Sequence, residues 1–312
     1  MVASNAVAIS AGTGHSLALR RDGTVNGWGG NIVGNATGIP TDAAPYLADA
    51  LVRIDGQLLS NVVSIAASRT FSLALKRDGT VATWGENYVP AGLTNVVAIG
   101  VDQAHSWILK SNGSVVGWFK ELSAHYGLLT AEGVSNAVAI AVGSAPQGGT
   151  RGLAILRDGT VANWGRKFEH PDANPPAGLS NVVAVAAGAG HSLALKKDGT
   201  VVGWGWNQWG EATGAPADDA TQNLTSFSSG PVRLDGRTLS NIVSIAAGRG
   251  YSIALKEDGT VATWGRMAWG LYPVTVPEGL SNVVAIAAGA EDFCLAITTN
   301  KAVADRFATG RN

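Results

Sequence analysis

The sequence predicts an all-β fold, a seven-bladed β-propeller that forms a single domain over residues 1–312. Three observations support this prediction. One motif, cleanest at Asn181–Gly205, recurs seven times along the chain. Each copy contains short apolar runs of strand length separated by Gly-rich breaks. No helical pattern lies between the copies, and repeated units of three or four strands with variable connectors are typical of propellers.

The strands are predicted from apolar patterning within each copy. Val182–Ala187 is a continuous apolar run, as expected for a strand that is covered on both faces. In the next run, His191, Leu193 and Leu195 alternate with small residues, so one strand face is large and the other small. Neighbouring blades of a propeller can nest in this way, whereas a two-sheet sandwich would leave one polar face.

A tight turn joins the second and third strands of each copy. Asp198-Gly199 lies between two apolar runs, and this dipeptide is a strong hairpin signal. We therefore predict a type I′ turn here and at the equivalent Asp-Gly or Asn-Gly pairs. An aspartate repeated in most copies and replaced by asparagine in others is a turn residue, since both side chains serve a turn.

The repeat cores extend over residues 5–30, 61–87, 95–119, 136–166, 181–207, 241–266 and 282–307. The last copy has lost both the Asp-Gly turn and the Trp-Gly pair. We expect the ring to close near the two termini, with Lys301–Phe307 supplying or replacing the final strand.

Two long connectors distinguish the first and fifth copies, Gly30–Leu59 and Trp206–Leu239. Each ends in a second Asp-Gly motif, within VRIDGQLLSN (Val52–Asn61) or VRLDGRTLSN (Val232–Asn241). This motif predicts a small extra hairpin outside the blade. The close match of the two segments indicates that a larger unit was duplicated.

Composition limits the classes of partner. The net charge is −1, with 22 Lys+Arg and 23 Asp+Glu, and no run of either sign. A nucleic-acid partner is therefore not expected. No apolar stretch reaches the roughly 20 residues of a membrane span, and the N-terminus lacks a signal-peptide pattern. The single cysteine, Cys294, lies in an apolar run and is predicted to be buried and inert.

Comparison of the copies argues against a repeated catalytic site. His15, His105 and His191 share one repeat position, which the other copies fill with Phe71, Arg151, Tyr251 and Phe293, so packing with a polar tip is the expected role. No His or Cys pair has zinc-like spacing, and no phosphate loop or dinucleotide motif is present. We assign no catalytic, cofactor or metal residue. Paired acids from different blades remain open, and Glu169-His170-Pro171-Asp172 is interpreted as a solvated loop.

The recurring pattern AAGxxHSLAL–DGTV–xWGxN, complete in Ala187–Asn207, resembles the repeat of the regulator of chromosome condensation family. This resemblance implies a seven-bladed propeller. Linkers such as PAGLSNVVA (Pro176–Ala184) resemble the bacterial branch of that family, which includes the secreted type II β-lactamase inhibitor protein. A secreted or extracytoplasmic bacterial location follows from the resemblance. The resemblance does not imply a function, because proteins that share one fold can have unrelated functions.

The predicted binding residues are aromatic side chains in connectors that follow the fifth and sixth copies: Trp206, Trp209, Trp269 and Tyr272. Exposed aromatics often serve as anchors for a protein partner or a sugar ring, although packing against the blades is the alternative. The leading hypothesis is a non-enzymatic module that binds a protein partner through connector loops and needs no cofactor. A carbohydrate-active propeller, lectin, hydrolase or lyase, is the second hypothesis. A ligand-free structural or engineered scaffold is the third.

Overall fold

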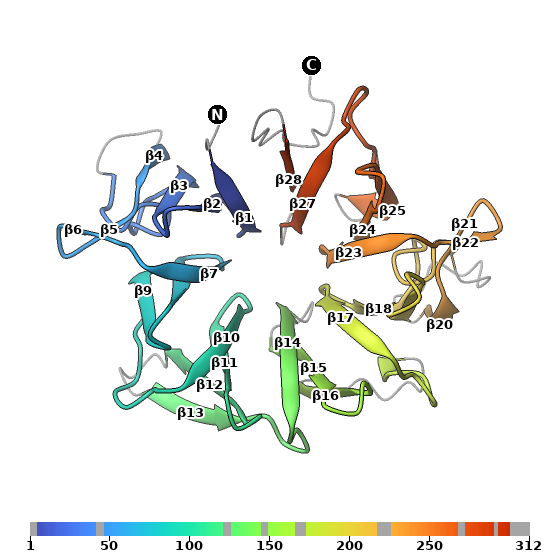
Figure 1. The fold of residues 1–312 in the computed structure, drawn as a ribbon, viewed down its shortest axis with the longest axis horizontal. Helices are drawn as coiled ribbons and strands as arrows, with labels where there is room; N and C mark the ends of the chain where they lie inside the picture. The colour runs from blue at the N-terminus through green and yellow to red at the C-terminus, as the bar shows by residue number, and fades with distance from the viewer. Residues whose placement is uncertain are drawn as a thin grey trace.

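The computed structural model describes residues 5–41, 47–120, 126–144, 149–165, 173–216, 226–267, 272–289 and 293–299. These residues form β-strands and contain no α-helix. No helix among them is therefore long and apolar enough to cross a membrane. Six antiparallel sheets of three or four strands are arranged as blades around a central axis (Figure 1).

The first three blades are formed by consecutive strands. Blade 1 contains β1 (Ala6–Ala11), β2 (His15–Arg20), β3 (Val25–Gly30) and β4 (Leu47–Leu51). Blade 2 contains β7 (Val62–Ala67), β8 (Phe71–Lys76) and β9 (Val81–Gly85). Blade 3 contains β10 (Val96–Val101), β11 (His105–Lys110), β12 (Val115–Lys120) and β13 (Tyr126–Thr130).

The remaining blades follow the same order. Blade 4 contains β14 (Ala137–Ser144), β15 (Thr150–Leu156) and β16 (Val161–Gly165). Blade 5 contains β17 (Val182–Ala187), β18 (His191–Lys196), β19 (Val201–Trp206) and β20 (Phe227–Pro231). Blade 6 contains β23 (Ile242–Ala247), β24 (Tyr251–Lys256), β25 (Val261–Met267) and β26 (Tyr272–Pro273).

The prediction of seven blades with three or four strands each is wrong for the seventh repeat. Its described residues form only the two-stranded sheet of β27 (Val283–Ala288) and β28 (Cys294–Thr298). This pair lies between blade 6 and β1, so it completes the ring (Figure 1). The repeat lacks the Asp-Gly turn that would start a third strand. Lys301–Phe307, the expected closing segment, lies outside the described residues.

The predicted hairpins outside the blades are present. They are β5 (Arg53–Ile54) with β6 (Gln57–Leu58), and β21 (Arg233–Leu234) with β22 (Arg237–Thr238). Asp55 and Gly56, and likewise Asp235 and Gly236, all have positive φ. These are the backbone angles of a type I′ turn.

The type I′ prediction is wrong for the turns inside the blades. At Asp198-Gly199 only Gly199 has positive φ, at 76°. The Gly199 N–H donates to the carbonyl of Lys196, and the Lys196 N–H donates to the carbonyl of Thr200. This is a type I turn followed by a left-handed glycine. The Asp198 carboxylate accepts hydrogen bonds from the N–H and hydroxyl of Thr200, which favours this type I turn over a type I′ turn.

The core lies between consecutive blades. Leu17 and Val25 of blade 1 pack with Val62 and Trp84 of blade 2, and similar clusters recur around the ring. The repeat-position tryptophans Trp118 and Trp204 are completely buried. Val183 departs from the expected burial: it is 54% exposed, because a bulge between Val182 and Ala184 turns it outward.

Candidate functional site

The antiparallel order of each blade places two sets of loops at one end of the propeller. The turns between first and second strands and the connectors after third strands share this end, which we call the connector face. The Asp-Gly turns and the two extra hairpins lie at the opposite end. Loops carry most binding residues in propellers and similar scaffolds, so the connector face holds the longest variable segments of this chain.

A cavity of about 150 Å³ opens at the centre of the connector face. Turns of all seven repeats line it, mostly with small residues such as Gly12, Gly188 and Ala189. Arg69 and Arg249 occupy equivalent positions on its rim, one in each duplicated unit. The lining contains no described cluster of histidine, cysteine and acids that could hold a metal ion.

The described aromatic candidates share the connector face but are not equally exposed. Trp206 is half-buried, and its ring covers Gly190 of the same blade. Trp209 is also half-buried, and its ring lies over Gly250 of blade 6, so it bridges two blades. Tyr272 is 48% exposed and pairs with Met267 at the outer edge of blade 6. Trp269 lies outside the described residues. Trp206 and Trp209 therefore pack partly against the blades, which was the alternative to a purely exposed binding role.

An asparagine side chain organises the loop that carries Trp209. Asn207 Oδ1 accepts the N–H groups of Ala212 and Thr213, at 2.9 and 3.0 Å. Its Nδ2 donates to the Thr213 hydroxyl and to the carbonyl of Ala215. The 31–38 loop of blade 1 has the same arrangement around Asn31. The 31–38 and 207–214 loops are therefore two copies of one structure.

A histidine lies beneath each of these loops and contacts the next blade. His15 Nε2 is 2.7 Å from the Ser72 hydroxyl, and His191 Nε2 is 2.8 Å from the Ser252 hydroxyl. Each serine donates its proton to a carbonyl of the loop above, that of Asn35 or Glu211. The serine must therefore accept from the ring, which places the imidazole proton on Nε2.

Burial keeps both histidines neutral. It lowers the pKa of His15 to about 4, and together with the nearby Arg151 it lowers the pKa of His191 to about 3. These residues are buried, as the predicted packing role requires, and their hydrogen bonds join neighbouring blades. They are also too deeply buried to contact a ligand. Cys294 is buried as predicted, and burial raises the pKa of its thiol to about 12.

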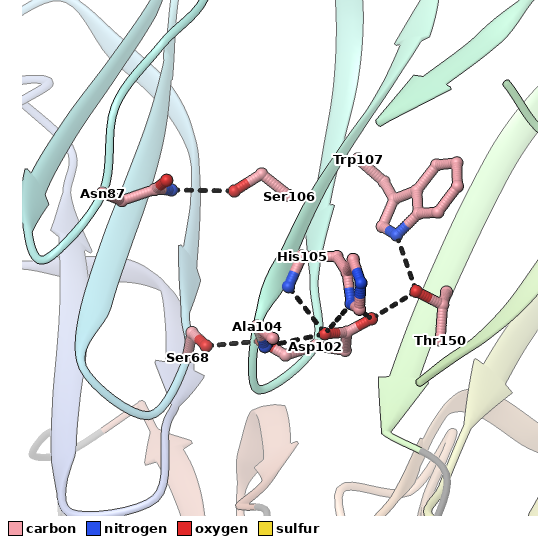
Figure 2. A network of polar contacts seen from close by, with 8 residues as sticks. All are labelled: Ser68, Asn87, Asp102, Ala104, His105, Ser106, Trp107 and Thr150. Carbon is pink, nitrogen blue, oxygen red and sulfur yellow. Dashed lines mark hydrogen bonds and ion pairs between the residues drawn. The ribbon is translucent and has the colours of Figure 1, made fainter. Parts of the chain in front are cut away.

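A different polar network joins blades 3 and 4 (Figure 2). Asp102 Oδ1 accepts the N–H groups of Ala104 and His105, both at 2.8 Å, and lies 2.9 Å from His105 Nδ1. Its other oxygen accepts the Thr150 hydroxyl at 2.6 Å, and Trp107 donates to that hydroxyl at 3.1 Å. The Ser68 hydroxyl of blade 2 donates to the Asp102 carbonyl.

Sequence comparison did not single out this network, although two signals were available. Asp102 stands where other copies have glycine or serine, and Gly152 stands where five copies have serine and the seventh has Cys294. In blades 2 and 6 this serine accepts from the histidine of the preceding blade. His105 therefore turns to Asp102 of its own blade. Thr150 contacts the carboxylate and not the imidazole, so the histidine does not activate it as a nucleophile. The arrangement replaces the inter-blade contact and does not form a catalytic triad.

The comparisons with known proteins agree with this architecture. The regulator of chromosome condensation (RCC1) repeat is recognised at residues 6–35, 62–89, 182–210 and 242–268. No curated protein matches the chain in sequence. Human WBSCR16 is similar in structure, with a TM-score of 0.66 and 19% identity, over 93% of this chain and 85% of that one.

Two further structures show the same fold. Prp20p of Saccharomyces cerevisiae has a TM-score of 0.61 and 20% identity, over 90% of this chain and 80% of that one, and its structure is described with its binding to Gsp1p and histones. The ectodomain of the Physcomitrella patens receptor kinase CR4 has a TM-score of 0.59 and 18% identity, over 94% of this chain and 70% of that one. Identities at this level establish the fold alone.

Proposed function

We propose that this propeller, which is built from RCC1 repeats, is a non-enzymatic module that binds a protein partner on its connector face. One observation carries the proposal: the variable, aromatic-bearing loops gather at one end, while the polar residues repeated in each blade are used to join blades. Prp20p, a protein of the same fold, binds the proteins Gsp1p and histones, which supports a binding role by analogy.

The anchors we propose are Trp206, Trp209 and Tyr272 at the junction of blades 5 and 6, with Trp269 as a further candidate. Half-buried indoles lying on glycine present a fixed apolar surface, so little side-chain entropy would be lost on binding. Tyr272 adds an exposed ring at the same end. Aromatic residues of this kind are frequent among the residues that dominate binding energy.

Site-specific photo-crosslinking tests the choice of face. A benzophenone amino acid at Tyr272 is compared with one at Val183, which is equally exposed at the opposite end. Crosslinks in extracts of the native source are expected from Tyr272 and not from Val183. A partner identified in this way is then purified. Equal crosslinking from both positions, or binding only of a glycan on an array, would overturn the proposal.

Binding measurements with the purified partner test the anchors. Tyr272→Ala should weaken binding with an unchanged melting temperature, because the side chain is exposed. Trp209→Ala should weaken binding by about 1–3 kcal/mol. A lower melting temperature of Trp209→Ala with unchanged affinity would identify Trp209 as a packing residue.

A further inference from the structure

We propose that the Glu211 carboxyl group is held protonated beneath the 207–214 loop, where it takes the place of the Asn35 donor above the unpaired Nδ1 of His191, and that its ionisation loosens this loop. The inference concerns regulation of the proposed binding site, because the loop carries Trp209. Only the regulatory consequence rests on the proposed function; the protonation of Glu211 and the loosening of the loop do not. Three independent observations lead to it.

The first observation is the equivalence of Glu211 and Asn35. They occupy the same position in two loops with the same internal hydrogen bonds, and each lies above a histidine. In blade 1 the Asn35 amide is 3.0 Å from His15 Nδ1. Since His15 carries its proton on Nε2, Nδ1 is an acceptor and Asn35 is the donor. Position 35 therefore supplies a permanent donor to the buried ring.

The second observation is an unsatisfied acceptor in blade 5. His191 is completely buried, and its Nδ1 has no hydrogen-bond partner among the described residues. Its Nε2 proton is used by Ser252, as in blade 1, so Nδ1 again needs a donor. An ionised carboxylate has no proton to give, whereas a protonated one has the same capacity as the Asn35 amide. Leaving a buried acceptor unpaired is costly.

The third observation is the environment of Glu211. The residue is only 1% exposed, and its Oε2 accepts the Trp209 N–H at 2.8 Å. Burial raises the pKa of the carboxyl to about 7, although the N–H groups of Glu211 and Trp209 partly oppose this shift. The carboxyl therefore changes charge near neutral pH, and it holds the backbone of the tryptophan that we propose as an anchor.

The groups around Glu211 do not supply a described counter-charge at the carboxyl. His191 on β18 is neutral, and Arg151 on β15 donates to Ser192 and to the carbonyl of Ala173. On blade 6, the Tyr251 hydroxyl donates to carbonyls of the seventh repeat, and Arg266 is an exposed residue at the end of β25. Ionisation would therefore leave a charge in a buried site without a counter-charge, which favours opening of the loop.

Hydrogen exchange tests the proposal without any partner. Protection of the 207–214 amides, corrected for intrinsic rates, is compared at about pH 5 and about pH 7.5. In the wild type it should fall by at least about tenfold, since opening is coupled to loss of the Glu211 proton. The 31–38 loop has no acid at the equivalent position, so it is the internal control and its protection should not fall as pH rises over this range. Glu211→Gln, a permanent donor, should remove the pH dependence, and Glu132→Gln, which removes an exposed acid, should keep it.

Infrared spectroscopy provides a second readout. The wild type should show a protonated-carboxyl band at about pH 6 that disappears by about pH 8 and is absent from Glu211→Gln. Parallel exchange in the two loops, or an unchanged pH profile in Glu211→Gln, would overturn the proposal. If that variant fails to fold, the wild-type comparison of the two loops and the wild-type band decide. Loss of partner binding in Tyr272→Ala tests the proposed function separately.

Discussion

Asn35 and Glu211 occupy equivalent positions in two copies of one loop, but only Asn35 has a hydrogen bond to the histidine beneath it. The loops are otherwise held by the same bonds, from Asn31 in blade 1 and Asn207 in blade 5. This pair provides a natural comparison within a single chain. It separates what the repeat requires from what one copy has changed.

Converting Asn35 into an acid should transfer the chemistry of blade 5 to blade 1. In Asn35→Asp, a carboxylate would face the Nδ1 lone pair of His15, and two acceptors cannot pair. We expect a loss of about 1–3 kcal/mol in unfolding free energy near neutral pH, with partial recovery on acidification. Asn112→Asp is the matched control, because other copies already carry aspartate in that turn. Denaturant titrations at the two pH values measure both; equal losses would contradict this expectation.

The buried histidines should make the protein sensitive to acid. The pKa of His15 is depressed to about 4, so the unfolded chain binds a proton on this residue at higher pH than the folded one does. Stability is therefore complete above about pH 6.5 and is lost as pH falls towards 4, by about 3 kcal/mol for this residue. His191 acts in the same direction.

Glu211 acts in the opposite direction, since its raised pKa favours the folded state at low pH and that contribution is lost as pH rises towards 7. The histidine effect is thus best measured in Glu211→Gln, by denaturant unfolding across this pH range. Adding His15→Gln should reduce the slope of unfolding free energy against pH. An unchanged slope would show that His15 does not control acid stability.

The Asp102 network should contribute to stability and not to catalysis. Asp102→Ala leaves the Thr150 hydroxyl and the N–H groups of Ala104 and His105 without their acceptor, so we expect a loss of about 1–3 kcal/mol. A double-mutant cycle with Thr150→Ala should give a coupling energy of about 0.5–3 kcal/mol. Additive losses in chemical denaturation would mean that the two side chains do not stabilise blades 3 and 4 together.

Two glycines separate steric crowding from backbone strain. Gly38 and Gly92 have similar positive φ values, 83° and 80°. A Cβ at Gly38 would lie 1.8 Å from the Arg53 carbonyl oxygen, whereas a Cβ at Gly92 would meet nothing within 4 Å. Gly92→Ala should cost about 1–2 kcal/mol from the left-handed backbone alone. Gly38→Ala should lower the melting temperature considerably more, and equal shifts would contradict the role assigned to packing.

The architecture could be predicted from the sequence because one motif repeats along the chain. Apolar runs, turn dipeptides and the seven-fold motif predict the strands, the blades and both extra hairpins, because each depends on local patterning. The strand faces of His191, Leu193 and Leu195 are buried as expected. The prediction of three or four strands was wrong for the seventh repeat, whose described residues form two strands. This repeat lacks the Asp-Gly or Asn-Gly turn that precedes the third strand in the other copies.

The Asp-Gly dipeptide by itself does not determine the type of turn. Asp-Gly forms type I′ turns in the isolated hairpins and a different turn inside the blades. Inside the blades, a threonine follows the glycine and donates to the aspartate, as Thr200 does to Asp198. In the hairpins, glutamine or arginine follows the glycine instead and this hydrogen bond is missing. The type I′ turn, with left-handed Asp and Gly, is therefore the preferred geometry there.

Repetition along the chain is enough to predict a propeller of similar blades, packing roles for the repeated histidines and tryptophans, and variation in the connectors. These properties follow from periodicity, which is local. The partner of Nδ1 in each repeated histidine depends on the three-dimensional arrangement: His15 pairs with Asn35 and His105 with Asp102, whereas Nδ1 of His191 has no partner among the described residues. Those contacts join residues from different strands and loops, and only the closed ring fixes their distances.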